Sequence, residues 1–186
     1  SRSSPGAAAA RPLTADRSVG LPALALAALG LGLALWGCAG RRIEGGVFHS
    51  PKGYRITLPG AVWTLAAAGP TDLELVDRGT GAGMLVNAAC EGGVARRSFS
   101  VLLRYPLFGL REREVLEEGE VSLNGRQAAH TVLEGRMRGA DERVQIELYV
   151  MKDDRCVYDF LYVAPPARFD RGRADFHRFL ETFATE

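Results

Sequence analysis

Cysteine and histidine are scarce in this 186-residue chain, and their scarcity excludes several kinds of chemistry. The sequence has three of each, with no C-x-x-C pair and no H-E-x-x-H motif, so the spacings of common zinc sites are missing. A G-x-S-x-G turn and a P-loop are missing too. The formal net charge is only +1, whereas nucleic-acid-binding proteins usually carry a strongly basic surface. We therefore expect no enzyme activity, no cofactor, no metal ion and no nucleic-acid partner.

The polar residues that stand out have ordinary structural interpretations. His49, His130 and His177 are far apart in the sequence, and we expect each to be solvated or hydrogen-bonded rather than a metal ligand. A cluster of glutamates is expected at a helix-to-strand junction, where a solvated face is favoured over a cation or partner site. Its members are Glu112, Glu114, Glu117, Glu118 and Glu120.

An uncharged run, residues 19–40, follows an arginine-containing start. A basic start, an apolar stretch and small residues at its end are the parts of a secretory signal. At the end of this run, Leu35-Trp36-Gly37-Cys38 resembles the lipobox of bacterial lipoproteins. The resemblance implies a diacylglycerol on the Cys38 thiol and cleavage that leaves Cys38 as the new N-terminus. The alternative is a permanent membrane span, because a run of about 20 apolar residues can cross a bilayer core.

These features divide the chain into a lipoprotein signal peptide (residues 1–37), a polar tether (38–45) and one exported domain (46–186). With either interpretation of the apolar run, the domain is tethered at a membrane surface. Ala39 follows Cys38, at the position where an aspartate signals inner-membrane retention in well-studied Gram-negative bacteria. We therefore expect a lipid-anchored protein on the periplasmic face of the outer membrane.

Hairpin patterns dominate the expected domain. Tyr54 to Leu58 alternates in hydrophobicity after a turn at residues 50–53, and Asn124-Gly125 is a strong hairpin signal. Trp63 is expected to pack over the core. Strands are expected at residues 54–58, 73–76, 84–88, 120–123, 128–133, 144–150 and 156–163.

Two helices complete the expected domain. One is expected over residues 98–110, kinked at Pro106 because proline cannot donate the helical hydrogen bond. The other is expected over residues 168–183, with one stripe of apolar side chains. The stripe contains Phe169, Phe176, Phe179, Leu180 and Phe183. The predicted fold class is α+β, an antiparallel sheet of hairpins with two helices.

The opening of the domain resembles that of Mog1/PsbP-like domains. The resemblance lies in residues 48–54 (Phe-His-Ser-Pro-Lys-Gly-Tyr), in the pattern Ile56-x-Leu58-Pro59-Gly60 and in Trp63, and it extends over residues 46–186. It implies an exported lipoprotein that acts as an accessory or binding subunit, and it defines no catalytic residues. We therefore expect a non-catalytic envelope lipoprotein with a protein partner. A carrier or sensor of a small apolar ligand and an enzyme with a dispersed site remain alternatives.

Cys90 and Cys156 are the thiols left once Cys38 carries lipid. In an oxidising compartment such a pair can form a disulfide, and both are expected at strand ends. The alternative is two separate buried thiols. A bridge would close a loop of roughly 65 residues, for which the chain-entropy model gives about 4 kcal/mol of stabilisation.

Overall fold

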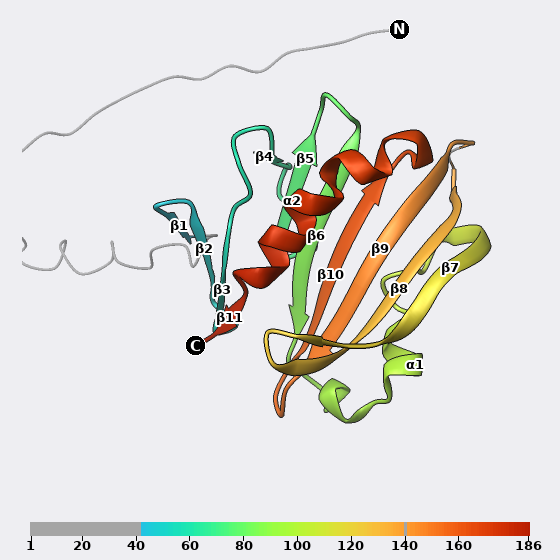
Figure 1. Cartoon of the computed structure of the whole chain (residues 1–186). Helices are drawn as coiled ribbons and strands as arrows, with labels where there is room; N and C mark the ends of the chain where they lie inside the picture. Colours follow the sequence, from blue (N-terminus) through green and yellow to red (C-terminus); the bar gives the residue numbers. More distant parts are fainter. Residues whose placement is uncertain (1–41, 140) are drawn as a thin grey trace, which may run out of the picture. The chain divides into compact units, whose positions relative to one another are not determined.

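The computed structural model describes residues 42–139 and 141–186. These residues form an α+β arrangement of two antiparallel sheets, with a helix across one face of the larger sheet (Figure 1). The small, 4-stranded sheet has the order β1-β2-β3-β11, and the large, 7-stranded sheet has the order β4-β5-β6-β10-β9-β8-β7. The expected signal peptide, the lipobox and Cys38 lie outside the described residues.

The small sheet consists of β1 (Arg42–Glu44), β2 (Val47–Ser50), β3 (Tyr54–Thr57) and β11 (Ala184–Thr185). The large sheet consists of β4 (Thr64–Leu65), β5 (Leu73–Asp77), β6 (Ala82–Ala89), β7 (Leu110–Leu123), β8 (Arg126–Met137), β9 (Arg143–Lys152) and β10 (Val157–Ala164). The helices are α1 (Phe99–Leu102), α2 (Phe169–Glu181) and the short 3-10 turns η1 (Val94–Arg96) and η2 (Pro166–Arg168).

The aromatic stripe of α2 packs against the large sheet, as the sequence predicts. All five residues of the stripe are buried, and α2 lies in front of β10 and β6 in Figure 1. They join Trp63, Tyr158, Phe160 and Tyr162 in one core. Burying a large apolar side chain contributes about 1.5–3 kcal/mol, so this stripe fixes α2 on the sheet.

The opposite face of the sheet has a cover of a different kind. Residues 94–110 lie against β8 and β9, where Leu102, Leu107 and Leu110 are buried in a second apolar cluster. Because side chains alternate along a strand, Tyr158 and Phe160 of β10 face α2, while Val157 and Leu161 belong to this second cluster. The sheet therefore has two distinct cores.

The hairpin predictions are confirmed. β2 and β3 pair around the turn at residues 51–53, and β5 pairs with β6. The turn between β7 and β8 is Asn124-Gly125, both with positive φ, as the tight hairpin turn requires. The Asn124 side chain also donates hydrogen bonds to the backbone oxygens of Leu180 and Phe183, at the end of α2.

The predicted helix at residues 98–110 is wrong beyond its first turn. α1 ends at Leu102, and residues 103–109 form turns before β7 begins at Leu110. Pro106 cannot continue the helical hydrogen bonds, and Gly109 adopts a φ of 97°, which ends any helix. As a result Tyr105, expected on the buried face, is 59% exposed.

The strand expected at residues 120–123 is only the last part of the 14-residue β7. The glutamate cluster therefore lies within a strand and not at a helix-to-strand junction. Regular structure also begins earlier than the sequence indicates: Arg42–Glu44 pairs with β2, so the expected tether already includes a strand. Within residues 42–139 and 141–186, no helix has both the length and the apolar character needed to span a membrane.

Candidate binding surface

A fully buried carboxylate joins α2 to the sheet. Glu147 of β9 has a side chain with no exposed surface, and four cationic or polar groups contact it. His130 Nε2 of β8 and His177 Nε2 of α2 each lie 3.0 Å from its Oε1, and Arg173 Nε of α2 lies 3.0 Å from its Oε2. The Tyr149 hydroxyl donates to the same carboxylate at 3.2 Å. The structure thus unites two of the three histidines that are far apart in sequence.

The Glu147 carboxyl of this cluster is ionised near neutral pH. Burial alone would raise the pKa of Glu147, but hydrogen bonds from His130, Arg173 and His177 outweigh it and lower the pKa to about 2. An acid with that pKa neither donates nor accepts a proton near neutral pH. No group of acidic, histidine or cysteine side chains able to hold a metal ion occurs in the part of the chain that the structure describes. The Glu147 cluster therefore holds α2 on the sheet.

The opposite sheet face contains a carboxyl group of another kind. Asp159 lies on β10 between Val157 and Leu161, which belong to the second core, and it is level with Asn87 of β6. Burial raises the pKa of Asp159 to about 7. Among the described residues it makes no hydrogen bond or ion pair. A shifted acid of this kind marks a candidate functional position when other polar groups converge on it, and here it is alone.

β7 forms the outer edge of the large sheet, at the right-hand side of Figure 1. Its residues 111–122 are all exposed, so neither face of the strand is covered along most of its length. Three apolar side chains, Val115, Leu116 and Val121, are 55%, 47% and 36% exposed. Unpaired edges of this kind accept further strands unless charge or irregularity prevents it.

Charge and irregularity are both present on β7. Glu112 pairs with Arg136, Glu114 with Arg143, and Glu117 with Arg173, while Glu120 accepts a hydrogen bond from Gln127. The ladder to β8 shifts register twice, between Arg111 and Glu114 and between Val115 and Glu117. Bulges twist an edge strand and reduce indiscriminate pairing. Most of the glutamates in the cluster therefore form a solvated face, as expected. The same strand also exposes apolar side chains.

A groove separates β7 and β8 from the segment that contains α1. Its volume is about 290 Å³, and its walls include Leu103, Leu107, Val115 and Leu133. Thr131 at its base donates a hydrogen bond to the Glu117 backbone oxygen. Polar and charged side chains, Ser100, Arg104, Arg113 and Glu118, also line it, and small-ligand sites likewise combine apolar walls with polar groups.

The structure joins Cys90 to Cys156 by a disulfide, with Cα atoms 4.0 Å apart. Cys90 follows Ala89 and Cys156 precedes Val157, and Ala89 and Val157 are paired positions of β6 and β10. The bridge therefore connects β6 and β10 at one end of the sheet, as the sequence analysis expected of these two cysteines. It also fixes the point from which residues 91–110 cross to the second sheet face.

Glu147 and Asp159 were not predicted as notable from the sequence, because each occupies a polar position in a normal alternating strand. One signal was present for Glu147: Arg173 and His177 are four residues apart in α2, so they share a helix face. A basic pair on a packed face needs an acidic partner, although the sequence does not indicate which strand supplies it.

Comparison with known proteins supports the fold. No family model and no curated protein sequence matches this chain. LpqN, described as involved in cell envelope biogenesis of Mycobacterium tuberculosis, is similar at a TM-score of 0.53 and 11% identity, over 74% of this chain and 88% of LpqN. A protein from Bacteroides thetaiotaomicron VPI-5482 is similar at a TM-score of 0.53 and 10% identity over 80% of this chain. This chain spans only about half (49%) of that protein.

A weaker similarity, with a TM-score of 0.49 and 13% identity, connects 85% of this chain to 99% of a cyanobacterial PsbP (CyanoP) from Synechocystis sp. PCC 6803. At these identities the solved structures define an architecture only. The class that follows is an α+β domain of antiparallel sheets with two helices, sharing its fold with LpqN.

Proposed function

We propose that this chain is a non-catalytic, membrane-tethered protein of the bacterial cell envelope that serves as a binding or accessory subunit. The observation that carries the proposal is β7, a long edge strand with exposed apolar side chains and exposed residues on both faces. An extended segment of a partner can add to such an edge, with main-chain hydrogen bonds giving affinity and side-chain contacts giving specificity. The glutamates on β7 favour a partner segment that carries basic residues.

The finer assignment of the domain as Mog1/PsbP-like belongs to this proposal and rests on the motifs around residues 48–63. The location also belongs to it. The lipobox resemblance supports a lipid anchor at Cys38, and Ala39 supports the periplasmic face of the outer membrane. The similarity in fold to LpqN, which is described as involved in cell envelope biogenesis, supports the compartment.

The proposal assigns no reaction to the chain. Glu147 is held ionised by its three partners, so it is not available as a general acid or base. Asp159, whose pKa burial raises to about 7, makes no hydrogen bond or ion pair with any described residue. Acid–base catalysis needs such a group within hydrogen-bond reach of its partner.

The anchor is tested by replacing its acceptor, Cys38→Ser, in the full chain. We expect the variant to lose both labelled fatty acid and membrane retention, while the Cys90–Cys156 bridge still forms. Loss of label with unchanged retention would identify residues 19–40 as a permanent span. Unchanged label would remove the lipid anchor from the proposal.

The partner surface is tested by placing a photo-crosslinking amino acid at Val115 or Leu116 in the full chain in cells. Val62 provides a matched control position because it is 62% exposed and precedes β4, at the opposite end of the strand order from β7. We expect both β7 positions, and not the control, to crosslink to the same protein. A Glu118→Lys substitution should weaken that crosslink because it repels a basic partner. Identical products from all three positions would contradict a binding role for β7.

A second candidate, a carrier of a small apolar ligand, is favoured by the groove between α1 and β7. Its volume of about 290 Å³ lies just below the usual range for ligand sites, about 300–1,000 Å³. An environment-sensitive apolar dye should bind the full chain in detergent-free vesicles and lose affinity in Leu133→Asn. If binding is equal in the variant, the groove is not the site.

A further inference from the structure

The segment between the disulfide and β7 differs in charge from the rest of the domain. Residues 92–111 contain four arginines and no aspartate or glutamate. Acidic residues return on both sides, at Glu91 and at Glu112. A block of one charge sign within a chain of net charge +1 produces a local positive potential.

This segment has an apolar inner side and a basic, aromatic outer side. Leu102 and Leu107 are buried against the sheet. Arg104, Tyr105 and Phe108 alternate with them and are exposed, and Phe108 is 83% exposed. The buried leucines fix the segment, so the outward direction of the other three side chains follows from packing.

Contacts link the outer side chains in two pairs, and Arg104 precedes Tyr105 of the first pair in the sequence. Arg97 donates a hydrogen bond to the Tyr105 hydroxyl at 3.1 Å. Arg138, from the turn after β8, lies over the Phe108 ring at 6.0 Å from its centroid. The backbone N–H of Arg138 also bonds to the Gly109 oxygen at 2.9 Å. We call Arg97, Arg104, Tyr105, Phe108 and Arg138 the basic-aromatic surface.

The arginines of this surface have no anionic partner. Arg97, Arg104 and Arg138 make no ion pair with any carboxylate in the described part of the chain. By contrast, Arg136, Arg143 and Arg173 on the neighbouring strands and α2 are all paired. Guanidinium groups bind phosphate well because their donors match its geometry.

We propose that the basic-aromatic surface docks on the anionic phospholipid headgroups of a membrane. Arginine beside exposed phenylalanine and tyrosine is the composition of interfacial membrane contacts, where the ring enters the headgroup region and the cation meets phosphate. A lipid surface is favoured over a protein partner because Tyr105 and Phe108 stand exposed beside arginines that have no carboxylate among the described residues, an arrangement that suits phosphate and the headgroup region together. The docking goes beyond the proposed partner binding and does not depend on acylation of Cys38.

The experiment uses the full chain reconstituted in vesicles, with Phe108→Trp as the reporter and acyl-brominated lipid as the quencher. Fluorescence of the parent, which contains Trp36 and Trp63, is subtracted. We expect excess quenching of the reporter in vesicles that contain phosphatidylglycerol and little in phosphatidylcholine alone. Salt at about 1 M, where the Debye length is about 3 Å, should remove the excess. Val62→Trp should show none.

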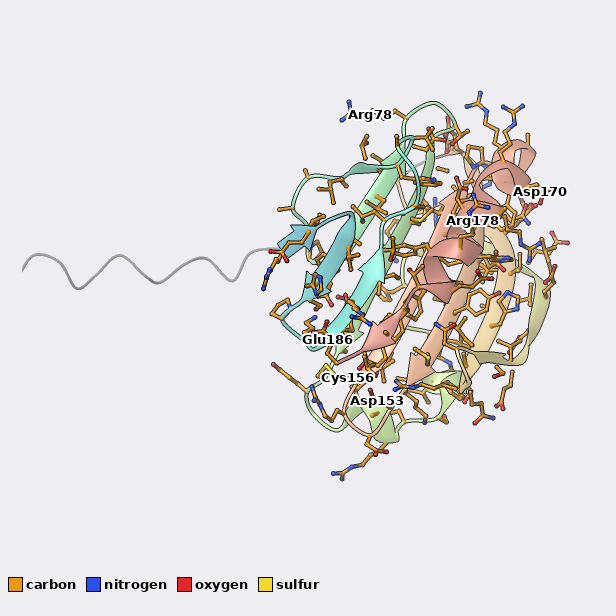
Figure 2. The ribbon with its side chains drawn as sticks, turned by 60° about the vertical axis from the view of Figure 1, so that its left-hand side comes forward. Arg78, Asp153, Cys156, Asp170, Arg178 and Glu186 are labelled. Carbon is orange, nitrogen blue, oxygen red and sulfur yellow. A yellow bond between two sulfur atoms is a disulfide. The ribbon has the colours of Figure 1, made fainter. Side chains whose placement is uncertain are left out.

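Charge variants of the reporter protein identify the cations. Arg97→Gln and Arg104→Gln should each lower the ratio of docked to undocked molecules about fivefold, since one cation near an anionic surface contributes about 1 kcal/mol. Arg78→Gln is the matched control: Arg78 is exposed on the loop between β5 and β6, at the other end of β6 from the Cys90–Cys156 bridge (Figure 2). It should leave the ratio unchanged. Circular dichroism and thiol labelling confirm that each variant folds.

Three outcomes would overturn the proposal. They are equal quenching in the two vesicle types, no quenching in either, and an effect of Arg78→Gln as large as that of Arg97→Gln. Absence of quenching is also the result expected if this surface binds an acidic protein. None of these outcomes affects the crosslinking test of β7, so the two proposals fail separately.

Discussion

Asp159 should make the domain less stable as the pH rises. Burial raises the pKa of this acid from 3.8 to about 7 in the folded domain, so the folded state holds the proton more tightly than the unfolded state. Below pH 3.8 Asp159 is protonated in both states, and the folded domain loses no stability. Between the two values only the unfolded state ionises, and stability falls until the pH passes about 7. The shift of about 3 pKa units corresponds to a loss of about 4 kcal/mol.

An Asp159→Asn variant removes this loss because an amide does not ionise. Near pH 8 we expect it to be more stable than the parent by about 2–4 kcal/mol, the lower figure allowing for an unsatisfied buried amide. Near pH 4 the two proteins should agree within about 1 kcal/mol, because the neutral acid and the amide are similar in shape and polarity. The assay is urea unfolding of the full chain in detergent micelles, followed by circular dichroism at both pH values.

Asp153→Asn supplies a control that should change the stability near neutral pH in the opposite direction. Burial acts to raise the pKa of Asp153, but backbone hydrogen bonds from Cys156 and Arg155 and the hydroxyl of Tyr158 outweigh it and lower the pKa. Its stabilisation is present above the unfolded pKa and lost at low pH, so Asp153→Asn should destabilise near neutral pH. If Asp159→Asn also destabilises the domain near pH 8, the Asp159 carboxylate is charged and solvated, and the reasoning is refuted.

Three further substitutions test the packing. Gly172→Ala would favour the helix by about 1 kcal/mol, but the new Cβ would lie 2.6 Å from Tyr162 Oη. We therefore expect the free energy of unfolding, measured with urea, to fall by about 1–3 kcal/mol. An increase would show that Tyr162 moves freely. Glu147→Gln should cost about 3 kcal/mol near neutral pH, and the difference should shrink as the pH falls from 4.5 towards about 2, in a titration of unfolding free energy. Replacing both Cys90 and Cys156 by alanine should lower the free energy of unfolding by about 4 kcal/mol. Reduction of the disulfide in the parent protein should destabilise it by a similar amount, and a smaller loss in the reduced parent than in the double variant would contradict this prediction.

Local signals made much of the fold predictable. The Asn124-Gly125 turn, the alternation around Tyr54 and the aromatic stripe of α2 each depend on residues close in sequence, and each is confirmed. Hairpin turns and amphipathic helices carry their geometry in a few adjacent positions. The opening Trp63 also lies in the core where expected.

Features that depend on distant residues escaped prediction. Most of β7 has neither strand alternation nor an apolar face, because both of its faces are exposed, so its charged residues suggest a loop or a solvated junction. The Glu147 cluster requires β8, β9 and α2 to meet, and no spacing along the chain encodes that meeting. Asp159 is distinctive only because its apolar neighbours partly bury it and raise its pKa. These are consequences of topology, which periodicity does not describe.

The two sheet faces explain where binding can occur in this domain. On the α2 face, the aromatic stripe fills the core and Glu147 finds a partner for each of its oxygens. The opposite face and the free edge retain unmet interactions: a partnerless acid at Asp159, arginines without carboxylates, and apolar side chains on β7. Groups that the fold does not satisfy internally gain most from an external partner. The proposed membrane contact and the proposed partner strand would therefore use the second face and its edge together, leaving α2 to hold the scaffold.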